Sequence, residues 1–157
     1  MIVFILFHAI MNIGVNVMNN LYDMLNLSGN KEDIIKESIT KTRYDLRNIV
    51  EAQRCKIYSS YLSDLLREKH LPNKIIKTGS FSNYDHHFVL VPKSSDIYYL
   101  IDLTYSQFNN REYFEELLDQ GYTEVNDSML IIYLSIVTGQ VINQSIDDIY
   151  FGNTKAR

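Results

Sequence analysis

Residues 86–104 read HHFVLVPKSSDIYYLIDLT, two apolar runs separated by Pro, Lys, Ser and Asp. β-branched and aromatic residues fill both runs and turn-forming residues separate them, so the stretch predicts an antiparallel hairpin with strands over 86–91 and 97–103. Asp102 stands within the second apolar run. A buried carboxylate costs free energy unless a partner satisfies it, so Asp102 is the strongest physical indication of a functional site.

Helices are predicted before this hairpin. Asn30 followed by Asp33 favours a helix start, and apolar residues at broken helical spacing continue to residue 50. A second helix is expected over 54–69, ending at Leu71-Pro72, because six apolar side chains there fall on one face: Ile57, Tyr58, Tyr61, Leu62, Leu65 and Leu66. Residues 74–78 then read as a further strand.

After the hairpin the helical pattern returns. Residues 111–120 are charged and amphipathic, 122–125 read as extended, and 128–138 are almost wholly apolar between Asp127 and Gly139. The order of elements predicts an α+β fold in which helices pack on a small antiparallel sheet.

Length and composition fit one compact domain. The chain has 157 residues, of which 46% are hydrophobic and 22% charged. Residues 1–18 are mostly apolar and carry no Lys or Arg, but His8, Asn12 and Asn16 interrupt them. Because Met11 and Met18 are alternative starts, we expect an N-terminal extension or loosely packed helix over 1–18 rather than a membrane-contacting segment, and a single domain over 19–157.

Charge and cysteine content exclude several classes of protein. The net charge of −4 argues against a dedicated nucleic-acid binder. The excess of basic residues between Lys31 and Lys77, eleven against seven acidic, is interpreted as a solvated helical surface. A single cysteine, Cys55, cannot form an internal disulfide, so the protein either belongs to a reducing compartment or simply uses no disulfide. We therefore expect a cytoplasmic protein, with export as an effector left open.

Cys55 falls in the first turn of the predicted helix 54–69. The unpaired N–H groups and the dipole of a helix N-terminus favour a thiolate, and a nearby protonated histidine favours it further. A histidine at the start of one strand can take the thiol proton, and a carboxylate on the next strand can orient the ring. His86 or His87, together with Asp102, fits these positions. Adjacent strand residues point to opposite faces, so only one of the two histidines can serve.

The segments 54–66, 86–91 and 99–104 resemble the transglutaminase-like branch of the papain-like cysteine enzymes. In that family a Cys opens a helix, a His is followed by small and bulky apolar residues, and an Asp follows two aliphatic residues on a strand. The separation of 31 residues between Cys55 and His86 is similar to that of compact members such as lasso-peptide leader proteases. The resemblance implies a papain-like core and a triad of Cys55, His86 and Asp102, with His87 as the alternative to His86.

The implied activity is acyl transfer or hydrolysis at an amide of a peptide or protein, as a protease, deamidase or transglutaminase. Gln53 and Asn48 are the expected substitutes for the family's oxyanion-stabilising glutamine. No cofactor is expected, and neither is a metal, because the adjacent His86 and His87 cannot both face one ion without distortion. The alternative function is an inactive interaction module with the same fold, in which Cys55 is a small core residue.

Overall fold

The computed structural model describes Gly14, residues 30–50 and residues 52–153. The chain divides into two compact units, Met1–Asp33 and Ile34–Arg157. Of the first unit, Gly14 and residues 30–33 are described, and they are helical. The segment expected over 1–18 and its boundary with the domain at residue 19 lie outside the described residues, Gly14 excepted. Within the described part of the chain, no helix has the length and apolar character needed to cross a bilayer.

The second unit is built on a four-stranded antiparallel sheet with the order β1-β2-β3-β4. Each strand therefore pairs with its neighbour in sequence, as in a meander. The strands are β1 (Lys74–Lys77), β2 (His87–Pro92), β3 (Tyr98–Ile101) and β4 (Tyr122–Val125). The hairpin predicted from residues 86–104 is confirmed as β2 and β3, with Val89 opposite Ile101 and Pro92 opposite Tyr98.

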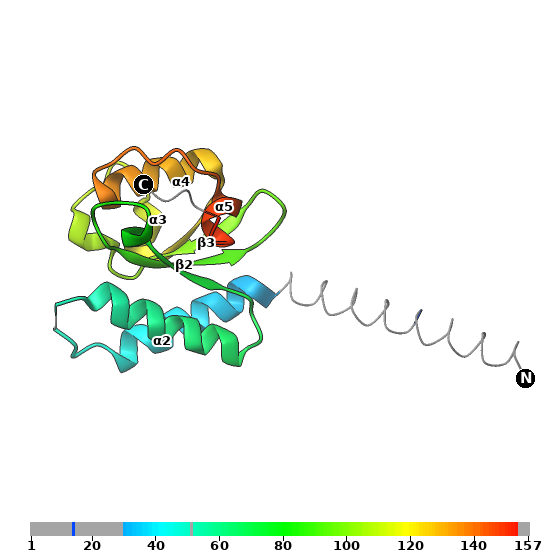
Figure 1. Ribbon diagram of the computed structural model, residues 1–157. Coiled ribbons are helices and arrows are strands. Elements are labelled where there is room, and N and C mark those ends of the chain that lie inside the picture. Colours follow the sequence, from blue (N-terminus) through cyan, green and yellow to red (C-terminus); the bar gives the residue numbers. More distant parts are fainter. Residues whose placement is uncertain (1–13, 15–29, 51, 154–157) are drawn as a thin grey trace, which may run out of the picture. The chain divides into compact units, whose positions relative to one another are not determined.

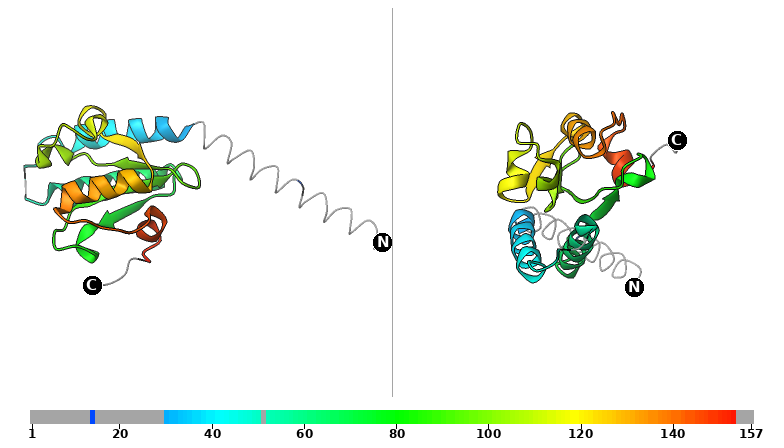
Figure 2. Two further views of the ribbon diagram at one scale, coloured as in Figure 1. Left: turned by 90° about the horizontal axis from the view of Figure 1, so that it is seen from above. Right: turned by 90° about the vertical axis from the view of Figure 1, so that its left-hand side faces the viewer.

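Helices cover both faces of this sheet, so the α+β class is confirmed (Figures 1 and 2). One face carries the helical residues 34–45 and α2 (Arg54–Glu68), and the other carries α4 (Asp127–Thr138). Shorter elements complete the unit: η1 (Thr78–Ser80), η2 (Tyr105–Phe108), α3 (Glu115–Asp119) and α5 (Ile146–Tyr150).

The alternation of side chains along β2 explains why it reads as one continuous apolar run. Phe88 and Leu90 enter the core cluster that includes Leu130 and Tyr133 of α4. Val89 and Val91 enter the second cluster, with Leu62 and Leu66 of α2. Both faces of the strand are buried, so every position after His87 is apolar.

Two helices differ in length from the sequence prediction, and one short helix was not predicted. The first helix ends at residue 45 rather than 50, and the carbonyl of Leu46 accepts a hydrogen bond from the Tyr58 hydroxyl at 3.0 Å. The helix expected over 111–120 is only α3, because the Asn110 side chain binds the N–H groups of Glu112 and Tyr113 in a turn. The five-residue helix α5 was not predicted, since it is too short to show apolar periodicity.

Candidate functional site

His86 and Asp102 lie at the same end of the sheet. His86 directly precedes β2 and Asp102 directly follows β3, and the two strands are antiparallel neighbours. The backbone N–H of Asp102 donates to the carbonyl of Gly121 at 3.0 Å, just before β4 begins. The backbone N–H of His86 donates to the Thr78 hydroxyl at 2.8 Å, just after β1 ends. Residues adjoining β1 and β4 therefore hold the ends of β2 and β3 at which His86 and Asp102 lie.

The two side chains form a buried pair. His86 Nε2 lies 2.8 Å from Asp102 Oδ2, and each side chain is 1% exposed. The same carboxylate oxygen accepts the Tyr133 hydroxyl at 2.7 Å. The other oxygen accepts the backbone N–H and the hydroxyl of Thr104, at 3.0 and 3.1 Å. These partners satisfy Asp102 as a buried carboxylate must be satisfied.

This network fixes the roles of the two ring nitrogens of His86. An ionised carboxylate only accepts hydrogen bonds, so Nε2 carries the hydrogen and donates to Asp102. Nδ1 is then the basic nitrogen of the neutral ring, and the Gln107 side-chain nitrogen lies 3.4 Å from it. The ring of Phe108 meets the imidazole edge to face at 4.8 Å. His86 is thereby held with Nδ1 as its hydrogen-bond-accepting nitrogen.

Tyr133 is a permanent donor to this network. Burial raises the pKa of Tyr133 well above its usual value, and the charge of Asp102 and its hydrogen bond raise it further, with a smaller contribution from the charge of Cys55. The hydroxyl therefore stays protonated across the physiological pH range.

Cys55 is the second residue of α2 and is partly buried. Contacts from the first turns of α2 reach the segment around His86: Lys56 Nζ lies 3.6 Å from Asp85 Oδ2, and the Ser59 hydroxyl donates to the carbonyl of His87 at 3.1 Å. The predicted placement of Cys55 at the start of a helix on the sheet is therefore confirmed. The backbone N–H of Cys55 lies in the first turn of α2, where N–H groups have no carbonyl acceptor within the helix.

The two candidate oxyanion residues, Gln53 and Asn48, are both exposed. Gln53 precedes α2 with a left-handed backbone, φ 72°, and is exposed. Asn48 is exposed in the turn that follows the helical residues 34–45. Among the described residues, no hydrogen bond joins either side chain to His86 or Asp102. Their role stays a prediction, and the amide that does contact the histidine is Gln107.

His87 has a different partner. Its Nε2 lies 3.1 Å from Asp85 Oδ2, and its side chain is 9% exposed. Burial lowers the pKa of His87 below its usual value, and the charge of Asp85 only partly opposes this. Of the two histidines weighed from the sequence, the structure pairs His86, and not His87, with Asp102.

Sequence reasoning missed three residues of this network: Thr104, Gln107 and Tyr133. Thr104 and Gln107 follow Asp102 closely and could have been noticed as polar residues after a buried acid. Tyr133 gave no signal, because a tyrosine in an apolar helix reads as a core residue. In the described part of the chain, no three His, Cys, Asp or Glu side chains are grouped as metal ligands.

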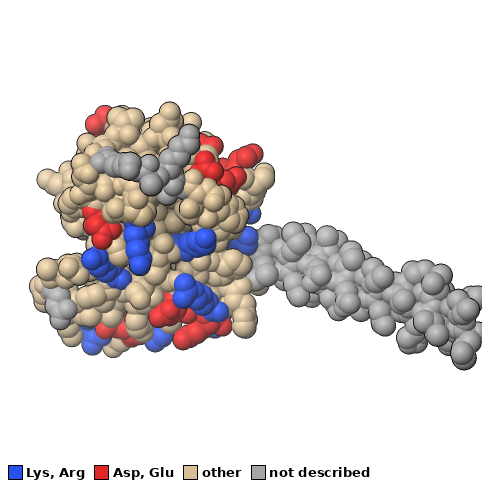
Figure 3. Space-filling view, in the orientation of Figure 1, with Lys and Arg blue, Asp and Glu red and all other residues tan. Residues whose placement is uncertain are grey.

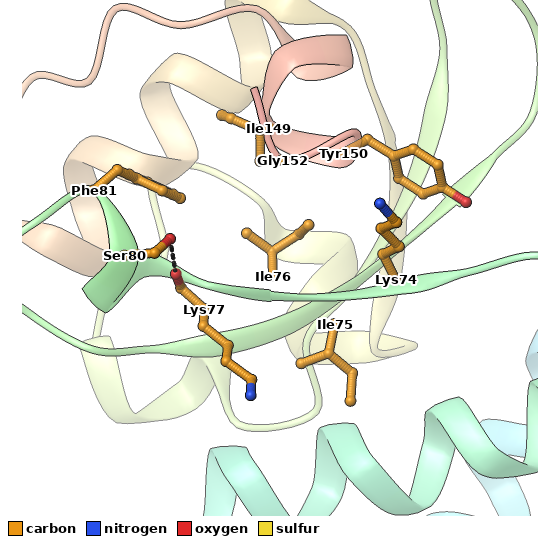
Figure 4. A pocket seen from close by; sticks show the side chains of 9 residues that line it. All are labelled: Lys74, Ile75, Ile76, Lys77, Ser80, Phe81, Ile149, Tyr150 and Gly152. Atoms are coloured by element: carbon orange, nitrogen blue, oxygen red, sulfur yellow. Dashed lines mark hydrogen bonds between the residues drawn. The ribbon is translucent and has the colours of Figure 1, made fainter. Parts of the chain in front are cut away.

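Two pockets differ in their relation to this network. A pocket of about 230 Å³ adjoins it, lined by Arg54, Leu103, Thr104, Ser106 and Gln107. A second pocket, of about 280 Å³, lies along the edge strand β1, with Lys74 and Tyr150 on one side and Phe81 on the other (Figure 4). Only the first pocket shares residues with the network around Asp102.

The face of the molecule seen in Figure 3 carries a band of Lys and Arg side chains across its middle.

Comparisons with protein-family models, with curated proteins and with solved structures found no match to this chain.

Proposed function

We propose that the protein catalyses thiol-dependent acyl transfer or hydrolysis at an amide of a peptide or protein, with Cys55 as nucleophile, His86 as base and Asp102 as orienting carboxylate. The buried His86–Asp102 pair carries this proposal, since two such groups are costly to bury and the first turn of α2 reaches the same segment. The resemblance to the papain-like and transglutaminase-like enzymes supports the same roles and a papain-like core.

In the proposed reaction, the Cys55 proton passes to His86 Nδ1 and the sulfur attacks the amide carbonyl carbon. Asp102 stabilises the resulting imidazolium through Nε2. The imidazolium then gives its proton to the leaving amine, and a thioester remains on Cys55. Attack by water releases an acid, whereas attack by an amine forms a new amide, so protease, deamidase and transglutaminase activities share this intermediate.

Gln107 supplies a donor for the carbonyl oxygen in this proposal. Its side-chain nitrogen contacts Nδ1 in the resting state, where Nδ1 is an acceptor. Once Nδ1 is protonated it can no longer accept, so the amide is released to donate to the oxyanion, together with the N–H of Cys55 at the start of α2. We also propose that the enzyme works in the cytoplasm, because the reducing conditions there keep a lone catalytic thiol free.

The test is the rate of Cys55 alkylation by iodoacetamide between pH 5 and 10, in the wild type, His86→Ala and His87→Ala. Because Cys55 is the only cysteine, the modified site is unambiguous. We expect fast alkylation near neutral pH in the wild type and in His87→Ala, and a rise displaced to higher pH in His86→Ala. Burst release of 4-nitrophenol from 4-nitrophenyl acetate, lost in Cys55→Ala, should accompany it.

The opposite result supports the interaction module. If Cys55 reacts only as fast as an ordinary thiol, whose pKa is near 8.5, and His86→Ala leaves its pH profile unchanged, the proposal fails. If His87→Ala instead displaces the profile, the nucleophile stands and His86 is the wrong base.

A further inference from the structure

The pocket of about 230 Å³ lies between the start of α2 and the segment that follows Asp102. Arg54 lines it from α2 and directly precedes Cys55 in the chain. Gln107 lines it from η2 and is in contact with His86. The pocket is therefore lined by the residue that precedes the proposed nucleophile in the chain and by a side chain that contacts the proposed base.

The lining of this pocket combines one cation with polar side chains. Arg54 is the single charged residue among its lining residues, beside the hydroxyl-bearing Thr104 and Ser106, the amide of Gln107 and the apolar Leu103. Within the described part of the chain, no carboxylate forms an ion pair with Arg54. The pocket therefore carries a cation and no carboxylate in its lining, an arrangement suited to an anion.

Arg54 is exposed, and its guanidinium contacts a buried aromatic side chain. It lies over the ring of Tyr58, 5.4 Å from its centroid, and one of its nitrogens lies 3.4 Å from the Tyr58 hydroxyl. Tyr58 is buried, and its hydroxyl donates to the carbonyl of Leu46. An arginine fixed on a buried aromatic ring loses less side-chain entropy on binding a carboxylate than a free surface arginine does.

We propose that this pocket binds a carboxylate of the substrate, so that the enzyme prefers peptides bearing negative charge next to the attacked amide. The inference rests on the function proposed above. The volume of the pocket is below that of pockets for drug-sized ligands, and it suits one side chain of the size of Asp or Glu. The carboxylate comes from an acidic side chain or from a free C-terminus, and both sources share the same contact with Arg54.

The first experiment compares alkylation of Cys55 by iodoacetate and by iodoacetamide, in the wild type, Arg54→Gln and Arg54→Glu. Both reagents attack the same thiolate, so the ratio of their rate constants cancels any change in thiol reactivity. We expect the ratio of iodoacetate to iodoacetamide to fall about 5-fold in Arg54→Gln and further in Arg54→Glu, as for the loss of one favourable charge contact of about 1 kcal/mol. Added salt should shrink the difference.

Arg47→Gln is the matched control. Arg47 also lies over an aromatic ring, 4.2 Å from the centroid of Tyr44, but it does not line the pocket. Its substitution should leave the ratio unchanged. A ratio that is equal in the wild type and Arg54→Gln, or that falls as far in Arg47→Gln, overturns the inference. Circular dichroism checks that each variant is folded.

Charged esters identify the source of the carboxylate. Mono(4-nitrophenyl) succinate carries the charge on the acyl group, as an acidic side chain before the attacked amide would. 3-Carboxy-4-nitrophenyl acetate carries it on the leaving group, as a free C-terminus would. The ester that is favoured over 4-nitrophenyl acetate in an Arg54-dependent manner names the source, and a preference for neither overturns the inference.

The two proposals fail in different ways. Slow reaction of Cys55 with both alkylating reagents, independent of His86, contradicts the proposed function. A fast, His86-dependent reaction in which the ratio of the iodoacetate to the iodoacetamide rate constant does not depend on Arg54 contradicts only the proposed carboxylate pocket.

Discussion

The Tyr133 hydroxyl donates to Asp102 Oδ2 at 2.7 Å, the same oxygen that lies 2.8 Å from His86 Nε2. Tyr133 comes from α4 and Asp102 from the end of β3, so the contact joins the helix layer to the sheet. A buried carboxylate bound on both sides of one oxygen has little freedom to rotate. The direction of the His86 ring thus depends on a helix far from it in sequence.

Tyr133→Phe should destabilise the fold by about 2 kcal/mol, because it removes a buried hydrogen bond to a charged group and keeps the ring. Urea unfolding measures the change. Tyr105→Phe is the control, since Tyr105 is equally buried but its hydroxyl donates to a neutral carbonyl, that of Tyr113, at 3.2 Å. We expect about 1 kcal/mol there. Equal losses in the two variants would contradict a charged acceptor at Tyr133.

Cys55→Ala should abolish activity and cost less than about 1 kcal/mol, because a partly exposed thiol at a helix start contributes little to the core. Asp102→Asn should abolish activity and cost about 3 kcal/mol, since its amide group would meet hydrogen-bond donors in a buried site. Thermal and urea unfolding, with ester turnover, separate the two effects. A strongly destabilised Cys55→Ala that retains turnover would show that the thiol is only a core residue.

The sequence predicted the framework of this fold well, for a physical reason. The strands around Val89 and Leu100 are buried on both faces, so each appears in the sequence as a continuous apolar run that is typical of a buried strand. The lengths of the first helix and of α3 were predicted wrongly, because local contacts ended them: a tyrosine hydroxyl on the Leu46 carbonyl and a turn around Asn110. Such contacts depend on residues that the periodicity does not weigh.

The site was predictable only where burial made a residue anomalous. Asp102 was identified because an acid within an apolar run needs partners, and the structure supplies four hydrogen-bonding contacts to it. Tyr133 and Gln107 are ordinary in their own segments and become distinctive only through their distance from His86 and Asp102. No sequence pattern reports that proximity.

The burial of His87 predicts a pH dependence of stability. Burial keeps the pKa of His87 below its usual 6.5 in the folded protein, so the unfolded chain binds a proton first as the pH falls. Stability contributed by the neutral form is therefore present above about pH 6.5 and is lost as the pH falls from the unfolded pKa through the lower folded pKa. Urea unfolding of wild type and His87→Gln from pH 5 to 8 should show a shallower acid loss in the variant. Parallel curves would contradict it.

Gly121 should resist substitution because its backbone has φ +85° and its carbonyl accepts the N–H of Asp102. An added Cβ would lie 2.5 Å from Leu103 Cδ2 and 3.0 Å from Arg43 Nη2. Gly139, with φ +68°, has no neighbour within 4 Å of such a Cβ, so Gly139→Ala reports the backbone cost alone, about 1 kcal/mol. Gly121→Ala should cost clearly more in urea unfolding. If the two costs are equal, Leu103 and Arg43 move aside freely.

Gln107→Ala should separate acylation from alkylation at Cys55. Acylation by 4-nitrophenyl acetate builds an oxyanion, so loss of one donor should slow it about 100-fold. Alkylation by iodoacetamide builds none and should change less than about 3-fold. Gln140→Ala removes a glutamine whose side chain binds only the Asn83 N–H among the described residues, and should change neither rate. If both rates fall together in Gln107→Ala, the amide acts on His86 rather than on the substrate. If neither falls, the donor must come from elsewhere, and Gln53 and Asn48 become the variants to measure.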